Sequence, residues 1–256
     1  MNNSLFRYLP LFALNFALYL PSSAHADKAS TVDPYALSII QSASNYLGSA
    51  KNVQFVAEIC EDAAIEDGPI LQIARTVTVS LTRPAGLRLE VAAPEPTRTF
   101  THNGKALTIY DVRTGFYGSI DAAPSLDETI SNADEIGIHF PIEDLLVSKP
   151  FGDGASKADS GQYLGLVNVL GTECHHLAFQ SKSIEWQAWV QTGPKPLLRK
   201  VAVTFKDEDD ARLTAHISNW DLDTAIPASA FTFTPPPNST KIEVLPAEEG
   251  KTKEAK

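Results

Sequence analysis

The sequence predicts a mainly β (α+β) protein, a half-open antiparallel β-barrel of about eleven strands with helices over its opening. Two blocks of residues, 52–119 and 162–220, alternate apolar and polar side chains with a period of two, as strands with one buried face do. Helical spacing occurs only before the first block and between the blocks. Because a parallel α/β fold would alternate each strand with a helix, this order favours an antiparallel sheet.

The first 26 residues have the order of a secretory signal peptide. Arg7 precedes an apolar run over residues 9–20, and the small-residue pattern Ala24-His25-Ala26 ends the segment. Pro10 interrupts this run, which is also shorter than the roughly 20 apolar residues that a membrane-spanning helix needs. We therefore expect cleavage near Ala26, export to the periplasm and no stable membrane insertion.

Residues 27–245 are expected to form one half-barrel domain, followed by a disordered tail. The tail, residues 246–256, is rich in charge and has no apolar spacing. Removal of residues 1–26 takes away Arg7 and no acidic residue, so the net charge of −10 becomes −11. Phosphate polymers and anionic membrane surfaces repel such a chain, which argues against nucleic acid as a partner.

The first predicted element after the signal peptide is an amphipathic helix over residues 33–48. Asp33 is placed to cap it, Pro34 suits its first turn, and Gly48 ends it. Six strands should follow, and Asn103-Gly104 is the strongest hairpin turn among them. Their expected ranges are 52–62, 70–82, 86–93, 97–102, 106–111 and 115–119.

Helical pieces separate the two strand blocks. Ser125-Leu126-Asp127-Glu128 is a capping box that opens a helix, Gly137 ends it, and Pro141 begins a short helical turn. The second block should have five strands, over 162–170, 173–181, 184–192, 197–206 and 211–220. The acidic residues 207–210 between the last two are interpreted as a solvated hairpin tip, since a calcium loop needs a longer ligand pattern with a glycine at its bend.

A series of short motifs spans most of residues 75–242. It comprises Arg83-Pro84 with Leu87-Arg88, Asn103-Gly104-Lys105 with Ile109-Tyr110-Asp111, Pro141 with Asp144-Leu145-Leu146, Gly171 with Cys174-His175-His176-Leu177-Ala178-Phe179, Trp186-Gln187-Ala188-Trp189-Val190, Pro196-Leu197-Leu198-Arg199-Lys200, Trp220, and Phe231-Thr232-Phe233 before Pro235-Pro236. This pattern resembles an uncharacterised family called predicted periplasmic proteins, within the superfamily of the lipoprotein carrier LolA and the receptor LolB. The resemblance implies a LolA-like half-barrel and a hydrophobic ligand. It implies no particular activity.

Two cysteines, Cys60 and Cys174, remain after export into an oxidising compartment. They either form a disulfide or stay as two free thiols, and the sequence leaves both alternatives open. His175 and His176 are adjacent on a strand and point to opposite faces, so they cannot bind one metal together. Cys174 and His176 share a face, but a zinc site needs two further ligands and no second pair has suitable spacing. We therefore predict no metal and no cofactor.

Motifs of catalysis are missing from the sequence. It has no Gly-x-Ser-x-Gly elbow, no His-Glu-x-x-His helix and no phosphate loop. The carboxylate pairs Asp127/Glu128 and Glu143/Asp144 lie near helix starts, where the helix dipole favours negative charge. The sequence therefore favours a protein without enzymatic activity, and a hydrolase is the least favoured interpretation.

The preferred hypothesis is a binding or carrier protein for a hydrophobic ligand, such as a lipid acyl chain or a lipoprotein. A large barrel that its own side chains do not fill encloses a ligand cavity. The alternative is a module that binds an envelope protein through a sheet edge or the helical cover, and a filled core without a ligand also stays open. Candidate residues of the cavity wall are Val77, Val79, Leu81, Leu87, Leu89, Ile109, Trp186, Val201, Val203, Phe205 and Ile217.

Overall fold

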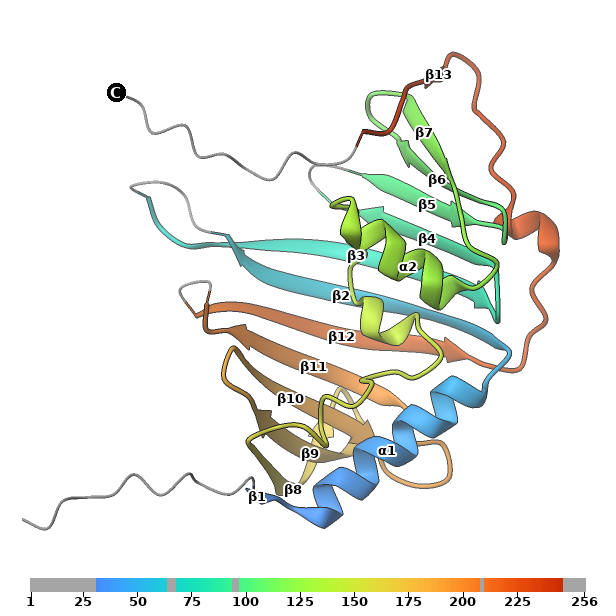
Figure 1. Ribbon diagram of the computed structural model, residues 1–256. Helices are drawn as coiled ribbons and strands as arrows, with labels where there is room; N and C mark the ends of the chain where they lie inside the picture. The colour runs from blue at the N-terminus through green and yellow to red at the C-terminus, as the bar shows by residue number, and fades with distance from the viewer. Residues whose placement is uncertain (1–30, 64–67, 94–96, 208–209, 246–256) are drawn as a thin grey trace, which may run out of the picture.

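The structure is a computed structural model that describes residues 31–63, 68–93, 97–207 and 210–245. The described residues form one sheet with helices and irregular segments over one of its faces (Figure 1). The predicted signal peptide and C-terminal tail, and residues 208–209 of the acidic hairpin tip, lie outside the described residues. The mainly β fold class is confirmed.

All eleven predicted strands are present, with bounds close to those expected. They are β2 (Asn52–Ala63), β3 (Leu71–Thr82), β4 (Leu87–Ala92), β5 (Arg98–His102), β6 (Ala106–Asp111), β7 (Phe116–Asp121), β8 (Ser160–Val169), β9 (Thr172–Gln180), β10 (Ile184–Gln191), β11 (Leu198–Phe205) and β12 (Ala211–Asp221). Neighbouring members of this set pair antiparallel. Two short strands add to them, β1 (Thr31–Val32) and β13 (Thr240–Lys241).

The sheet is open, as the predicted half-open barrel implies, and it does not close into a full barrel. Its order is β1-β8-β9-β10-β11-β12-β2-β3-β4-β5-β6-β7-β13. Closure would require β7 to pair with β8, but β13 pairs parallel with β7 and β1 pairs parallel with β8. The sheet is therefore a curved surface, and its concave face needs helices and loops to cover it.

The two strand blocks meet where β2 pairs with β12. This antiparallel ladder places Ala57 opposite Ile217 and Ile59 opposite Ala215, and all four side chains are buried. The pairing joins residues far apart in the sequence, which local patterns do not predict. It makes one continuous apolar face out of two separate hairpin series.

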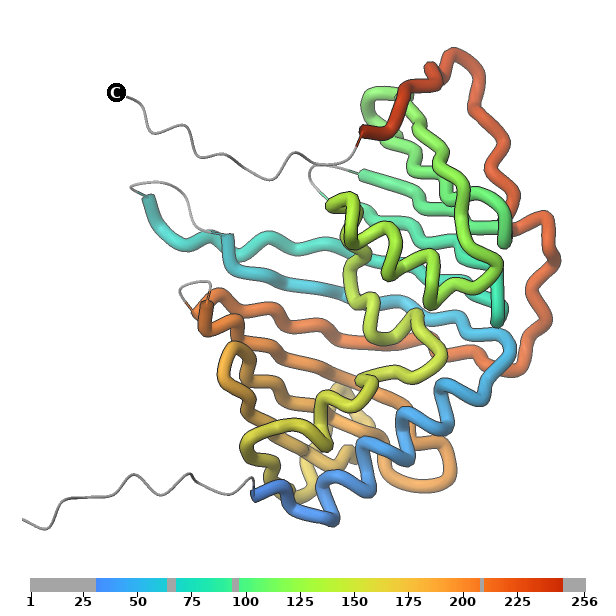
Figure 2. Tube along the Cα trace, viewed as in Figure 1, coloured from blue at the N-terminus to red at the C-terminus, as the bar shows by residue number. Residues whose placement is uncertain are grey.

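Two α-helices lie on the same face of the sheet (Figure 1). In α1 (Pro34–Ser49), the Asp33 side chain accepts a hydrogen bond of 2.8 Å from the Tyr35 backbone N–H, and the helix contacts β8 and β10. In α2 (Leu126–Glu135), Ser125 Oγ accepts from the Glu128 backbone N–H at 3.3 Å, as the capping box predicts. Figure 2 shows the chain between α2 and β8 crossing this same face, with the 3-10 helix η1 (Glu143–Leu145) on its way.

Under α2, the concave face is filled by side chains. Leu126, Ile130 and Ala133 of α2 belong to one buried cluster with Leu89 and Phe100 of the sheet. A second contact is polar: His102 Nε2 lies 3.1 Å from the Ala123 carbonyl oxygen and 3.0 Å from Thr129 Oγ1. His102 has no exposed surface, and burial lowers its pKa. A neutral imidazole thus ties α2 to β5.

The C-terminal segment packs on the other side of the sheet. The 3-10 helix η2 (Ala228–Phe231) contacts β4, and the Phe233 ring lies 5.6 Å from Tyr110 and 5.1 Å from Tyr117 between centroids. Tyr110 follows Ile109, so in a strand its side chain points away from the face that holds the core. Among the described residues, the concave face is covered mainly by the two helices and the chain between α2 and β8, and Val244 lies over Gly118 of β7.

Candidate functional site

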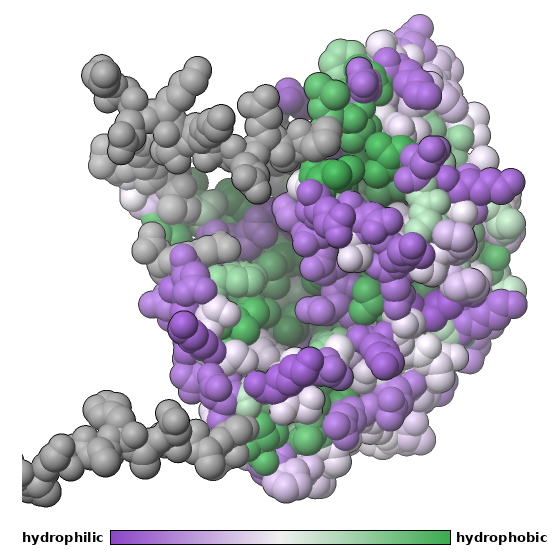
Figure 3. Space-filling view, in the orientation of Figure 1, coloured by the Kyte–Doolittle hydropathy of each residue, from purple (hydrophilic) through white to green (hydrophobic). Residues whose placement is uncertain are grey.

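A cavity of about 680 Å³ lies between the sheet and the chain that follows α2. Figure 3 shows a hollow with an apolar floor and a hydrophilic border. The lining residues are His139, Phe140, Pro141, Ile142, Glu143, Asp144, Leu145, Phe151, Ile184, Trp186, Leu198, Val201, Val203, Phe205 and Leu213. Its size is in the range of pockets that hold one small molecule, about 300–1,000 Å³.

The sheet wall of the cavity is a row of apolar side chains across three strands. Trp186 of β10 is opposite Val203 of β11, and Val203 is opposite Leu213 of β12. Because alternate residues of a strand share a face, Val201 and Phe205 extend the same wall along β11. None of these five side chains is fully buried, so the wall faces open space.

Aromatic rings close one end of this wall. The Trp186 ring stacks on Phe179, with centroids 4.4 Å apart and planes at 20°. On its other side, Phe151 lies 6.2 Å away at 10°. A rigid aromatic surface of this kind presents a large apolar area to a ligand at low entropic cost.

The opposite wall is residues 139–151, which we call the cover segment. It is anchored at three places: Ser44 Oγ of α1 donates to the Pro150 carbonyl at 2.6 Å, Arg83 Nη1 donates to the Leu146 carbonyl at 2.8 Å, and the Ser148 backbone N–H donates to Asp127 Oδ1 at 2.9 Å. These bonds hold the segment to both helices and to the sheet. They keep it at a fixed position above β10–β12.

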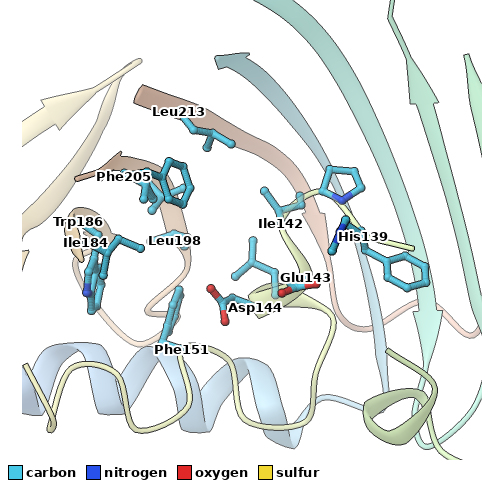
Figure 4. Close-up of a pocket in the computed structure, with 15 residues that line it drawn as sticks. His139, Ile142, Glu143, Asp144, Phe151, Ile184, Trp186, Leu198, Phe205 and Leu213 are labelled. Atoms are coloured by element: carbon cyan, nitrogen blue, oxygen red, sulfur yellow. The ribbon is translucent and has the colours of Figure 1, made fainter. Parts of the chain in front are cut away.

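Two cover-segment residues that line the cavity have left-handed backbone conformations. Ile142 has φ 53° and Phe151 has φ 65°. Such angles are costly for a β-branched or aromatic residue, and they persist where the surrounding structure fixes them. They turn both side chains toward the sheet wall in Figure 4.

Two carboxylates lie among these apolar side chains. Figure 4 shows Asp144 pointing toward the side of the cavity with Leu198 and Phe151, and Glu143 on the side of His139. Burial raises the pKa of Glu143, and the neighbouring charges of Asp144 and Asp134 add to this. Asp144 is exposed at the border of the cavity, and desolvation by the surrounding protein still raises its pKa. A carboxylate here is more weakly solvated than one on an open surface.

Of the eleven predicted wall residues, the structure brings four together at the cavity: Trp186, Val201, Val203 and Phe205. The others lie elsewhere. Val77, Val79, Leu81, Leu87, Leu89 and Ile217 are buried in the filled core, and Ile109 packs against that core. The cavity therefore occupies the β10–β12 half of the sheet, away from α2.

Sequence reasoning placed the ligand between the sheet and the helical pieces of residues 33–48 and 125–147, but it missed the side chains of the cover segment as part of the site. Its carboxylates, Glu143 and Asp144, were explained by their position at a helix start. A signal was present in the sequence, because Ile142 and Leu145 flank two acidic residues without a basic neighbour. Only the fold shows that this acidic turn faces the apolar wall of another strand block.

Cys60 and Cys174 are free thiols in the structure. They lie on β2 and β9, which are four strand steps apart in the sheet, about 19 Å at the usual strand spacing. A disulfide needs its Cα atoms within about 7 Å. Of the two alternatives, the geometry therefore favours free thiols. Within the described residues, no group of three or more His, Cys, Asp or Glu side chains could hold a metal ion.

The family model described as "Predicted periplasmic protein (DUF2092)" matches residues 36–245, which include every element that builds the cavity. The chain belongs to this family. The resemblance expected from the sequence is therefore confirmed. No curated protein matches the chain. In the part of the chain that the structure describes, no helix has the length and apolar character to cross a membrane.

Solved structures similar to this member of the predicted periplasmic family are distant in sequence. The lipoprotein LppX of Mycobacterium tuberculosis is 11% identical, with a TM-score of 0.49, over 75% of this chain and 100% of LppX. LprF of Mycobacterium bovis is 15% identical, with a TM-score of 0.45, over 77% and 98% of the two chains. A LolA superfamily protein of Nitrosomonas europaea is 13% identical, with a TM-score of 0.36, over 77% and 97%.

Proposed function

We propose that this protein is an exported periplasmic binding or carrier protein that takes the apolar chain of a small ligand into the cavity between the cover segment and β10–β12. One observation supports this more than any other. About 680 Å³ beside Trp186, Val203 and Phe205 is not filled by side chains, whereas Val79, Leu89 and Leu107 in the neighbouring half of the same face are buried in the core. The family description, predicted periplasmic protein, supports the location, and the signal-peptide pattern of residues 1–26 supports the route of export.

The cavity wall supports binding of a chain by burial alone. Each buried methylene contributes about 0.8 kcal/mol, so eight of them contribute about 6 kcal/mol before the costs of association. The lining residues include no serine, threonine, cysteine or lysine that could act as a nucleophile, and His139 is the only imidazole among them. Binding is therefore a better fit to this site than covalent catalysis.

Protein purified from the periplasm is expected to contain lipid that native mass spectrometry detects and solvent extraction removes. Extracted protein should then bind hexanol, octanol and decanol with rising affinity. Because one methylene is worth about 0.8 kcal/mol, each added methylene should tighten binding about fourfold until the cavity is full. Isothermal titration measures the series. Lipid-free protein from cells that also shows no dependence on chain length would contradict the proposal.

Binding of an envelope protein is a second candidate, favoured by the outer edge of β8. Among the described residues, β1 pairs only with Ser160 and Gly161, so the rest of this edge has no strand partner. Leu164, Leu166 and Leu170 are 50%, 57% and 83% exposed along it. An uncovered apolar edge can pair with a strand of another protein. In the same native mass spectra, one dominant protein adduct without lipid would favour this candidate.

A further inference from the structure

The ionisable groups of the cavity have one sign of charge. Its lining contains Glu143 and Asp144 and no lysine or arginine, and the only other titratable side chain is His139. His139 is already engaged, since its Nδ1 lies 2.7 Å from Asp134 Oδ1. A ligand that places its polar end here therefore meets negative charge.

Two cations close to the sheet wall in sequence or by strand pairing are engaged in ion pairs. Lys206 follows Phe205, and its Nζ lies 2.8 Å from Glu185 Oε1. Arg75 is ion-paired with Glu61, the residue opposite Leu213 on β2. Neither of these two cations can neutralise a ligand anion without breaking its ion pair.

The two cavity carboxylates are themselves unpaired. Neither the Glu143 nor the Asp144 side chain makes a hydrogen bond or an ion pair with another residue in the described ranges. The charged groups that act on Glu143 are Asp144, Asp134 and His139, and the two aspartates disfavour its charge. Partly desolvated carboxylates without a partner gain from a hydrogen-bond donor, and most from a positively charged one.

We propose that the cavity selects amphiphiles that combine one apolar chain with a positively charged, hydrogen-bond-donating end, such as a primary amine, over fatty-acid anions of equal length. The chain lies along Trp186, Val203 and Leu213, and the ammonium group donates to Glu143 and Asp144. This inference rests on the proposed function, because it assigns the polar end of a ligand whose chain occupies the same cavity.

The test compares three ten-carbon probes, decylamine, decanol and decanoate, by isothermal titration at pH 7.5 and 0.15 M salt. The salt screens remote surface charges beyond about 8 Å. We expect decylamine to bind at least tenfold more tightly than decanoate, with decanol between them. The double variant Glu143→Gln with Asp144→Asn should reduce the ratio of the two affinities to less than threefold.

A matched control variant changes the net charge of the protein by the same amount as the cavity variant. Glu135→Gln with Glu173→Gln removes two exposed carboxylates away from the cavity and should preserve the tenfold preference. If this control loses the preference as fully as the cavity variant does, surface charge explains it and the inference is wrong. If all three probes bind equally well, the inference is wrong and the proposed function stands. If none of them binds, the proposed function itself fails.

The preference for decylamine should also weaken as the pH is lowered. The pKa of both carboxyl groups is raised, so they become protonated at a higher pH than ordinary carboxyl groups do. Decylamine stays protonated throughout this range, because alkyl amines titrate near pH 10. The affinity for decylamine should therefore fall as pH is lowered from 7.5 to 5, while that for decanol stays constant. An affinity for decylamine that rises toward low pH would contradict the inference.

Discussion

Val203→Trp is expected to abolish chain binding while the protein stays folded. Val203 is the middle of the cross-strand row with Trp186 and Leu213, and its side chain faces the open cavity. An indole at this position takes up space that the chain needs. Exclusion of three methylenes costs about 2.4 kcal/mol, so the affinity for decanol should fall at least tenfold. Isothermal titration measures the affinity, and thermal unfolding checks the fold.

The neighbouring residue on β11 provides the control. Thr204 pairs with Glu185 and Arg212, and its side chain points to the opposite face of the sheet. Thr204→Trp adds almost the same bulk to the same strand, so it should leave decanol binding within a factor of two. Equal losses in both variants would mean that strand distortion, and not occupation of the cavity, explains the effect.

Leu89→Ala is expected to cause the largest loss of stability, about 2–5 kcal/mol, with no change in ligand affinity. Leu89 is fully buried in the filled half of the sheet, in the same cluster as Leu126 and Ile130 of α2. Truncation there leaves a void that its surroundings only partly close. Denaturant unfolding measures the change, and titration with decanol checks the site.

Val203→Ala is the corresponding truncation in the β10–β12 half of the sheet, where the cavity lies. The variant removes two carbon atoms, but the side chain already borders empty space, so the loss should stay below about 1.5 kcal/mol, the usual upper limit for removing a single methylene from a packed core. Its affinity for decanol should change instead. A loss of stability as large as that of Leu89→Ala would show that Val203 is packed in a filled core and that the cavity does not exist in solution.

The strands could be predicted because their signals are local. In β3, the alternate residues Val77, Val79 and Leu81 are buried, and this period of two is visible in the sequence. The Asn103-Gly104 turn also follows local chemistry. The Asn103 side chain accepts hydrogen bonds of 3.0 Å from the backbone N–H groups of Lys105 and Ala106, and Gly104 has φ 82°. These features need no knowledge of distant residues.

The cavity could not be placed because its walls come from different parts of the chain. The alternation of apolar and polar residues along the strands predicts that the side chains of Leu89 and Val203 face the concave side. It does not predict what covers that side. Leu89 is buried in one cluster with residues of α2, whereas Val203 and the cover segment both line the cavity, and the cover segment is bonded to Ser44, Arg83 and Asp127. The alternating patterns around Leu89 and Val203 look the same in the sequence. The difference between a core and a cavity depends on these long-range anchors.

The two short strands at the edges of the sheet were not predicted, for a similar reason. β1 and β13 have two residues each, which is too short for any period to be recognised. Their parallel pairing with β8 and β7 decides that the barrel stays open. The local sequence pattern predicts which side chains of a strand are buried. Which strand pairs with it is determined by the tertiary structure.

The most direct test of the cavity is short-range quenching of tryptophan fluorescence by 10-bromodecanol. Trp186 lines the cavity, whereas Trp189 stacks on His176 and Trp220 packs against Phe55. Bound bromodecanol should quench the wild-type protein, and Trp186→Phe should bind it with similar affinity but lose most of the quenching. Equal quenching of both proteins, or none at saturating probe, would contradict an apolar chain between the cover segment and β10–β12.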